Sequence, residues 1–383
     1  MLVLARRVSF NGESALAIRP VPYQRRREHE DVSTLNDVAR LAGVSTMTVS
    51  RVINGSGYSS VETRARVNSA ITELGYMPNA LARQLRSKRT RTIALVLTDI
   101  ANPFFTTVAR GVEDAARLKG YAVMFCNTDE SEVEELEYIR VLIQRRVDGV
   151  LLVPATNSSE SLELLRKHGL PVVVLDRRLS AADVDGVRGD SEAGGHLAVR
   201  HLLDLGHRRI AVLTGPETVS TAVDRVAGYR RALADEGLSF DDEIVVFGEF
   251  NEASGREMTE RVLAIRPRPT AIFAGNNFIA FGAIQALREA ALGIPDDMSV
   301  VVFDDLPQGW VFDPFLTVVA QPAYEIGRQA AELMLERLAG DAPVEPRTIV
   351  LPGALITRRS TSQPRRKMIA SAPNDQAQPE NYA

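Results

Sequence analysis

The sequence predicts two joined parts: a small all-α helix-turn-helix domain, and an α/β body of two lobes with doubly wound parallel sheets. Short helical apolar patterns fill residues 33–77, and from residue 91 apolar runs alternate with helix-like segments. Charge is divided between the parts, because residues 33–91 carry a net +6 while the whole 383-residue chain carries −4. A basic module on an acidic body is typical of a DNA-binding domain attached to a receptor or an enzyme.

The ends of the chain and its cysteine usage limit the possible classes. Residues 1–32 show no sustained periodicity and contain the run Arg25–Arg27, so we expect a disordered N-terminal extension. The single cysteine, Cys126, excludes an intramolecular disulfide framework and fits inert core in a reducing compartment. No apolar run is long enough to span a membrane, and no secretory signal is evident, so we expect a cytoplasmic, nucleoid-associated protein with no membrane partner.

The helices of the first part have recognisable start and stop residues. Thr34 with Asp37 forms a capping box, Gly43 ends the first helix, and Ser45 or Thr46 caps the second. The third helix begins at Ser59 or Ser60 and ends at Gly75. The apolar stripes predicted for the three helices are Val38, Leu41 and Ala42; Val49, Val52 and Ile53; and Val67, Ala70, Ile71 and Leu74. The domain is expected over 33–77, with a short helix and linker over 78–90.

A helix-turn-helix predicts which residues read DNA. The second helix would enter the major groove, where a guanidinium can bridge guanine O6 and N7. Its outward positions are Thr46, Met47, Ser50 and Arg51, and Arg51 supplies that guanidinium. Hydroxyl and amide side chains suited to phosphate contacts are Thr34, Ser45, Ser50, Asn54 and Thr63.

The body is expected over residues 91–360. Its strand-like runs are Ile93–Leu97, Ala122–Cys126, Gly149–Val153, Val172–Leu175, Ile210–Leu213, Ile244–Phe247, Ala271–Ala274, Val300–Phe303 and a last strand, Thr348–Leu351. Most are continuous rather than alternating, which favours parallel strands buried on both faces. We divide them into lobe one (about 91–190 and 322–350) and lobe two (about 191–320 and 351–360), followed by a disordered tail over 361–383.

Polar residues that follow the predicted strands indicate a ligand cleft. Ligands of doubly wound sheets bind at the carboxyl ends of the strands. The side chains expected there are Asp99, Asn102, Asp176, Arg177, Arg178, Asn276, Asn277, Asp304 and Asp305. Carboxylates, amides and guanidinium groups suit a sugar, whose hydroxyls both donate and accept, and Phe104, Phe105, Phe250 or Trp310 would stack on it.

At this point the residues resemble the LacI/GalR family of bacterial transcription regulators. The resemblance spans about residues 33–360. It is carried by Thr34–Asn54, Glu73–Leu85, Asn102–Phe105, Arg146–Gly149, Leu205–Arg208, Arg225–Tyr229, Arg268–Phe273, Val302–Asp305 and Leu316–Pro322. It implies a periplasmic-binding-protein-like body and a homodimer on double-stranded, palindromic operator DNA, with a higher oligomer left open. A small-molecule effector, expected to be a sugar or sugar derivative, would control a repressor allosterically.

The resemblance also assigns residues. The segment from Pro78 to Leu85 matches a hinge helix that enters the minor groove, with Leu85 as the wedge and Asn79 and Arg83 as backbone or groove contacts. The effector contacts map onto Asp176, Arg225, Asn276 and Asp304, with Phe104 and Phe250 near the walls and Trp310 as a stacking candidate.

Structural alternatives remain for several of these residues. Leu85 can pack the linker, Arg225 can form a salt bridge, Asp304 can cap a strand end, Phe104 can plug the core, and Trp310 can serve as a lid or interface residue. Two positions depart from the family pattern, with Asn277 where Asp is usual and Ser191 where Asn is usual. The first change would alter a ligand's charge preference or a hydrogen bond in the cleft.

Two other classes of protein fit less well. A solute-binding receptor shares the two-lobed body, but it has a signal peptide and no basic head. An α/β enzyme would need a phosphate-binding loop or a nucleophile elbow, and the sequence has neither. The histidines form no metal pair, and His207 fits a loop anchor. We therefore expect no catalytic residues, no metal and no cofactor.

Overall fold

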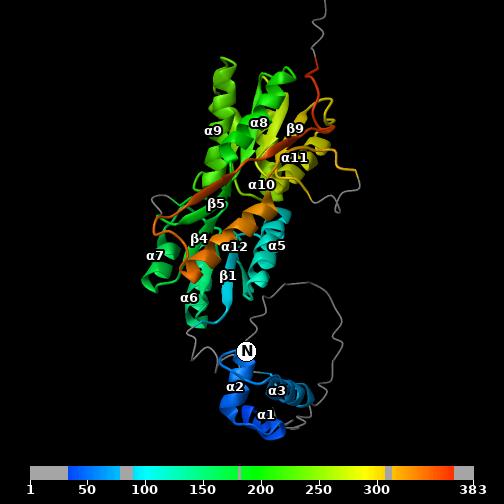
Figure 1. The fold of residues 1–383 in the computed structure, drawn as a ribbon. Helices are drawn as coiled ribbons and strands as arrows, with labels where there is room; N and C mark the ends of the chain where they lie inside the picture. The colour runs from blue at the N-terminus through cyan, green and yellow to red at the C-terminus, as the bar shows by residue number, and fades with distance from the viewer. Residues whose placement is uncertain (1–32, 78–88, 180–182, 307–312, 366–383) are drawn as a thin grey trace, which may run out of the picture. The chain divides into compact units, whose positions relative to one another are not determined.

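The computed structural model describes residues 33–77, 89–179, 183–306 and 313–365. The chain forms two compact units that divide after residue 86, and each is described here by itself. The first unit is the head, and the second is the body with its two lobes (Figure 1). No helix in the described ranges is both long and apolar enough to cross a membrane.

The head is a three-helix domain around a small core. Its helices are α1 (Leu35–Ala42), α2 (Thr46–Asn54) and α3 (Val61–Glu73). The core consists of Val38, Ala39, Ala42, Val49, Val67 and Ala70. The prediction that Leu41 faces this core is wrong, because its side chain is 46% exposed and the smaller Ala39 takes the inner position.

Capping defines the ends of these helices. The Thr34–Asp37 capping box is present, Ser45 caps α2, and Ser60 caps α3. Gly43, between α1 and α2, has a φ of 62°. A residue with a Cβ adopts this backbone conformation only at a cost in free energy. The turn that joins the two helices of the helix-turn-helix therefore depends on glycine.

Lobe one is built on a fully parallel sheet with the strand order β11-β5-β4-β3-β1-β2. The strands are β1 (Thr92–Leu97), β2 (Ala122–Asn127), β3 (Gly149–Leu152), β4 (Val172–Leu175), β5 (Asp185–Gly189) and β11 (Thr348–Leu351). Its helices are α5 (Pro103–Leu118), α6 (Glu132–Arg145), α7 (Glu160–Lys167) and α12 (Ala323–Ala339). Helix α12 packs along α5, although it follows a strand of lobe two (Figure 1).

Lobe two has the corresponding order β12-β10-β9-β8-β6-β7, in which β12 runs antiparallel to β10. The strands are β6 (Ile210–Thr214), β7 (Val245–Phe247), β8 (Ala271–Ala274), β9 (Ser299–Phe303), β10 (Thr317–Ala320) and β12 (Ala354–Ile356). Its helices are α8 (Ser191–Asp204), α9 (Ser220–Asp235), α10 (Glu252–Ala264) and α11 (Asn277–Glu289). The run predicted from Ile244 begins one residue later, since Asp242–Ile244 forms a 3-10 turn.

Three segments carry the chain between the lobes: β5 to α8, β10 to α12, and β11 to β12. The chain then stays on lobe two through Ser362, whose N–H donates to Ser299 Oγ at 3.0 Å. His207, predicted to anchor a loop, lies within hydrogen-bond distance of Thr270 Oγ1 (2.8 Å) and the Ser362 carbonyl (2.9 Å). Residues 361–365, which the sequence places in the tail, thus contact the body.

Three helix pairs pack with glycines facing each other. The pairs are Gly111–Gly327 between α5 and α12, Gly195–Gly228 between α8 and α9, and Gly255–Gly282 between α10 and α11. A Cβ placed on Gly228 would lie 2.1 Å from the Glu192 carbonyl oxygen, far inside van der Waals contact. Each lobe is therefore closely packed, and its helices have little room to slide.

Candidate functional site

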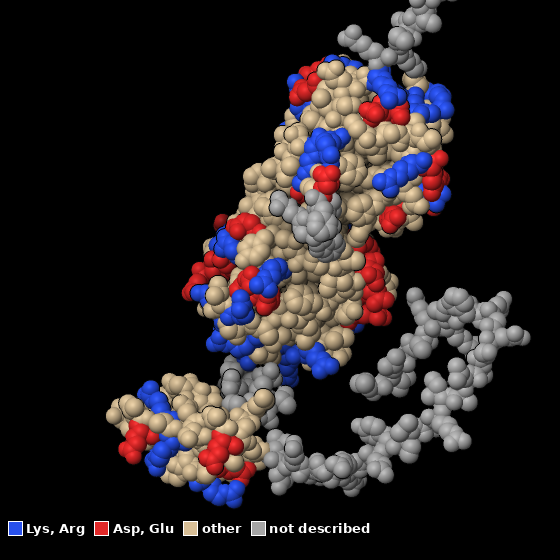
Figure 2. Space-filling model, turned by 90° about the vertical axis from the view of Figure 1, so that its right-hand side faces the viewer, with Lys and Arg blue, Asp and Glu red and all other residues tan. Residues whose placement is uncertain are grey.

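The exposed face of α2 carries the residues predicted to read bases. Thr46, Met47 and Arg51 are exposed and Ser50 is half-buried, while Val49 on the other face is in the core. Arg51 Nη2 lies 3.5 Å from Met47 Sδ, one helical turn away, so the two side chains form one surface. Figure 2 shows basic and acidic side chains side by side on the described surface of the chain.

The predicted phosphate contacts are partly engaged in local structure. Ser45 Oγ accepts the Thr48 N–H at 3.2 Å, and Thr63 Oγ1 accepts from Ser60 Oγ at 2.8 Å. Thr34 Oγ1 donates to Asp37 Oδ2 at 2.6 Å. Asn54 Nδ2 donates to the Ser50 carbonyl at 2.7 Å. In the structure these side chains form hydrogen bonds near the ends of α1, α2 and α3.

Some predicted site residues are not among those that the structure describes. Asn79, Arg83, Leu85 and Trp310 lie outside the described residues. Sequence reasoning did not select two exposed apolar side chains of the head: Tyr58 in the loop before α3, which is 92% exposed, and Val61, the first residue of α3, which is 84% exposed. An aromatic residue in a loop of glycine and serine was the available signal for Tyr58.

The body brings the predicted effector residues together. Asp176, Arg225, Asn276, Asp304, Phe104 and Phe250 all line one cavity between the lobes. The strand-end rule explains this convergence, since Asp176 follows β4, Asn276 follows β8 and Asp304 follows β9. The cavity has a volume of about 20 Å³, which is room for roughly one water molecule. The side chains of the two lobes therefore nearly fill the space between them.

The same cavity includes residues that sequence reasoning missed. Glu130, Thr221 and Gln321 also line it. Glu130, Asp176 and Asp304 all have left-handed backbones, with φ values of 58°, 60° and 74°. Such conformations are uncommon for residues other than glycine and cluster at ligand sites. Two carboxylates at strand ends, Asp176 and Asp304, and one in the loop after β2, Glu130, are thus held by a backbone conformation that the surrounding structure must stabilise.

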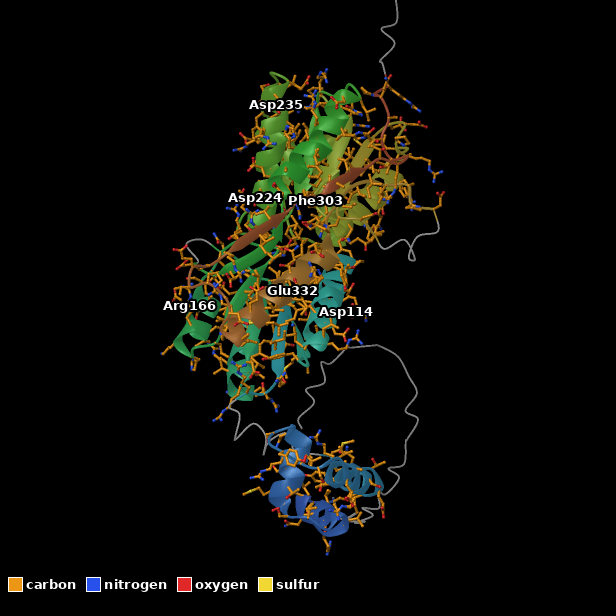
Figure 3. All side chains as sticks on the ribbon, viewed as in Figure 1. Asp114, Arg166, Asp224, Asp235, Phe303 and Glu332 are labelled. Carbon is orange, nitrogen blue, oxygen red and sulfur yellow. The ribbon has the colours of Figure 1, made fainter. Side chains whose placement is uncertain are left out.

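Arg225 forms the centre of the site. Its guanidinium lies 3.9 Å from the ring centre of Phe303, and its Nη1 donates to the Gly275 carbonyl at 2.5 Å. Burial lowers the pKa of this arginine, against the opposing effect of Asp304 and Asp176. In Figure 3, Phe303 lies where the two lobes meet, with Asp224 of α9 nearby.

Asp304 has a strongly perturbed carboxyl group, and burial also raises the pKa of Asp176 in the same cavity. Burial raises the pKa of Asp304 to about 6, although Arg225 and a hydrogen bond from Gln321 oppose the shift. Gln321 Nε2 donates to Asp304 Oδ1 at 2.7 Å, and Gln321 belongs to the segment that crosses from β10 to α12. The neighbouring Asp305 instead pairs with Arg358 at 2.7 Å, so the two carboxylates have separate surroundings.

Arg177 supports the site from lobe one. It makes two 2.6 Å hydrogen bonds to the Glu130 carboxylate and donates to the Pro154 and Ala155 carbonyls. Its guanidinium also lies 5.7 Å from the Phe250 ring centre, which belongs to lobe two. Burial lowers the pKa of Arg177, but Glu130 more than offsets this. Buried Arg177 therefore holds the Glu130 carboxylate through a bidentate pair and also contacts the Phe250 ring.

Several buried polar atoms of the site lack a partner within the described structure. They are Asp176 Oδ1, Arg225 Nε and Gln321 Oε1. Buried polar groups normally find a hydrogen-bond partner, and an unsatisfied group costs free energy. A ligand with both donors and acceptors would satisfy them.

The lobes are also bridged around the cavity. Arg178 pairs with Asp224, and its backbone N–H donates to Ser220 Oγ at 2.7 Å. Asn277 Nδ2 donates to Asn102 Oδ1 at 3.2 Å. Of the residues expected in the cleft, Arg178 and Asn277 thus bridge the lobes instead of lining the cavity.

A helix-turn-helix head and a two-lobed body with a polar cavity between its lobes are the features of a ligand-responsive DNA-binding protein. Comparison with known families agrees: residues 34–79 match the model "Bacterial regulatory proteins, lacI family". Residues 90–359 match the "Periplasmic binding proteins and sugar binding domain of LacI family". The chain belongs to the LacI family and is a DNA-binding transcriptional repressor with an effector-binding domain, not an enzyme.

Individual relatives cover the chain from the head to the body. The HTH-type transcriptional repressor PurR of Aliivibrio fischeri (strain MJ11) is 38% identical over 86% of this chain and 98% of its own length. The lac repressor dimer bound to operator and the anti-inducer ONPF is 29% identical, with a TM-score of 0.77, over 86% and 99%. The CelR–cellobiose complex is 35% identical, with a TM-score of 0.67, over the same shares.

Proposed function

We propose that this repressor binds a palindromic operator as a homodimer and releases it when a sugar or sugar derivative occupies the cleft. The convergence of six predicted effector residues on one interlobe cavity carries the proposal. In the head, Thr46, Met47, Ser50 and Arg51 would read the major groove, with Thr34, Ser45, Asn54 and Thr63 near phosphates. Asn79, Arg83 and Leu85 would act in the minor groove. Such a protein works in the cytoplasm, where the chromosome is.

The chemistry of the cleft supports a sugar. Asp176 and Asp304 can accept hydrogen bonds from hydroxyl groups, and Arg225 can donate to ring or hydroxyl oxygens. Phe104 and Phe250 offer apolar faces for a pyranose or furanose ring. A similar solved regulator, CelR, holds cellobiose. The same aromatic walls would also suit a planar nucleobase, which is the second candidate.

The homodimer is supported by an exposed strand edge. Strand β2 lies at the edge of its sheet, and its Met124 and Phe125 side chains are exposed. Uncovered apolar edges are aggregation hazards that proteins normally cover. The similar lac repressor forms a dimer on its operator. We place a second copy of this chain over the β2 edge.

Effector control would follow from lobe movement. A cavity of about 20 Å³ cannot hold a sugar, so binding requires the lobes to separate or the walls to rearrange. The three crossing segments are the pivots available for this movement. A ligand that binds one lobe arrangement better shifts the population toward it, and this changes the spacing of the two DNA-reading heads in a dimer.

Selection of random duplex DNA by the full chain, at one stated salt concentration, tests the proposal. Enrichment of a palindrome is expected, and operator affinity is then measured with cellobiose, ribose and a purine base as probes. Weaker operator binding with a sugar supports induction. Tighter binding would replace induction with corepression, and a response to the base alone would replace the sugar. No enrichment by the chain, with or without a metabolite pool, would overturn the DNA-reading role.

A further inference from the structure

We propose that Asn277 is a positioning residue that favours the closed arrangement of the two lobes through a hydrogen bond to Asn102, the N-cap residue of α5. This inference rests on the proposed function, because it concerns how the effector cleft is regulated. The bond joins Nδ2 of Asn277, the first residue of α11 in lobe two, to Oδ1 of Asn102 in lobe one at 3.2 Å. Asn277 is 1% exposed and Asn102 is buried, so water does not compete for the contact.

The acceptor has a fixed orientation. Asn102 Oδ1 also accepts the Phe104 N–H at 3.0 Å, which is the N-cap of α5. Turning the Asn102 amide over would put an NH₂ group against that N–H and would lose the cap. Position 277 must therefore supply a donor, and an asparagine amide does so without charge.

The bridge is connected to both aromatic walls of the cavity. Phe104 provides the N–H that shares Asn102 Oδ1, and its ring packs edge-on against Phe105 at 5.1 Å. Next to Asn277, Asn276 caps α11 and its Nδ2 lies 3.4 Å from the Phe250 carbonyl. An effector that displaces Phe104 or Phe250 would therefore disturb the bridge through one intervening residue.

An aspartate at position 277 would break this arrangement. It would direct a carboxylate oxygen at Asn102 Oδ1 and leave a charge buried beside another acceptor. At the N-terminus of α11 the same charge favours the helix, so Asn277→Asp is expected to remain folded. The variant thus separates closure of the lobes from helix stability, and Asn277→Leu removes the donor without adding charge.

Lobe separation in the full chain without effector tests the proposal. Spin labels at Lys167→Cys in lobe one and Glu257→Cys in lobe two use exposed helical positions. Burial raises the pKa of the remaining thiol, Cys126, to about 11, which keeps it unreactive. Labelled chains are diluted with unlabelled chains so that one labelled copy is present in each dimer.

We expect longer distances between the labels in Asn277→Asp and Asn277→Leu, and an unchanged distribution in the control Gln329→Ala. Gln329 donates to Glu325 within α12 and bridges no lobes. Asn102→Ser retains a capping hydroxyl but cannot reach Asn277, so it should match Asn277→Leu, and combining the two should add nothing. Loss of one such bond is expected to shift the open-to-closed ratio about three- to tenfold.

Unchanged distances in both Asn277 variants would overturn the inference. Operator binding is measured on the same proteins, so that failure of the bridge can be told apart from failure of the proposed function. If the native chain selects no operator, the proposed function fails while the label distances still report on the bridge. If operator affinity is normal and the distances do not change, only the bridge is refuted.

Discussion

The buried carboxyl group of Asp304, which lines the cavity, reduces the stability of the folded protein at neutral pH. Its raised pKa, about 6 against 3.8, means that folding disfavours the charged form. The stability associated with the protonated form is complete below about pH 4 and is lost as the pH rises through 6. At neutral pH the cost is about 3 kcal/mol.

Asp304→Asn should therefore raise the free energy of unfolding at pH 7.5 relative to the native chain, and the difference should shrink toward pH 4. Denaturant unfolding of the unliganded protein at both pH values measures this. Asp185→Asn is the control of opposite sign. Its pKa is lowered, because hydrogen bonds from Arg337 and the Arg347 N–H outweigh burial, so its substitution should destabilise more at pH 7.5 than at pH 4. If the native chain became more stable relative to Asp304→Asn as the pH rises from 4 to 7.5, the raised pKa of Asp304 would be contradicted.

Arg51 is the residue whose loss should change sequence preference. Arg51→Ala should weaken binding to the selected operator by about 1–3 kcal/mol and relax discrimination at one base pair of each half-site. Competition between the operator and single-base variants measures this. Arg64 of α3 donates hydrogen bonds to Ser59, which precedes the helix, and it provides the comparison, since Arg64→Ala should affect all sequences alike. An unchanged base preference in Arg51→Ala would remove Arg51 from the reading face.

At the residue scale, one rule predicted the place of several residues in the structure, while their role as effector contacts stays a prediction. The carboxyl ends of parallel strands gave Asp176, Asn276 and Asp304. Sequence reasoning failed for Glu130, which reaches the cavity from a loop of left-handed residues after β2, and for Gln321, which lies on a crossing segment. Their positions depend on contacts distant in sequence, such as the pair of Glu130 with Arg177.

At the scale of elements, strand β5 shows why a strand can be missed by sequence analysis. Strand β5, Asp185–Gly189, contains two glycines and two charged residues and so has no apolar run. It is a strand because it pairs with β4 on one side and with β11, more than 150 residues later, on the other. Tertiary pairing overrides local propensity there.

The close helix pairs of lobe two give a prediction of their own. In an exposed helix, Gly→Ala stabilises by roughly 1 kcal/mol. Gly228→Ala should instead destabilise by about 1–3 kcal/mol, because the added methyl meets the backbone of α8. Thermal unfolding measures the sign, and a gain in stability would show that α8 and α9 can separate at low cost.

For the molecule as a whole, the division of charge predicts a strong dependence on salt. Residues 33–91 carry a net +6, and the rest of the chain is acidic apart from the N-terminal segment. If two heads neutralise on the order of eight phosphates, the slope of log affinity against log salt is about −7. Titration of a random duplex at several salt concentrations checks this, and a slope near zero would contradict a head that holds DNA through its charge.

The three passages of the chain between the lobes also affect how the protein is made. During synthesis, lobe one lacks α12 and the strand β11 until residues 323–351 have left the ribosome. By then most of lobe two has already emerged. Lobe one, although its synthesis begins first, is therefore completed only after most of lobe two. A chain stalled shortly before residue 348 would expose the bare edge of β5. Such nascent chains would rely on chaperones at that stage, and a premature stop codon there would produce a protein prone to degradation.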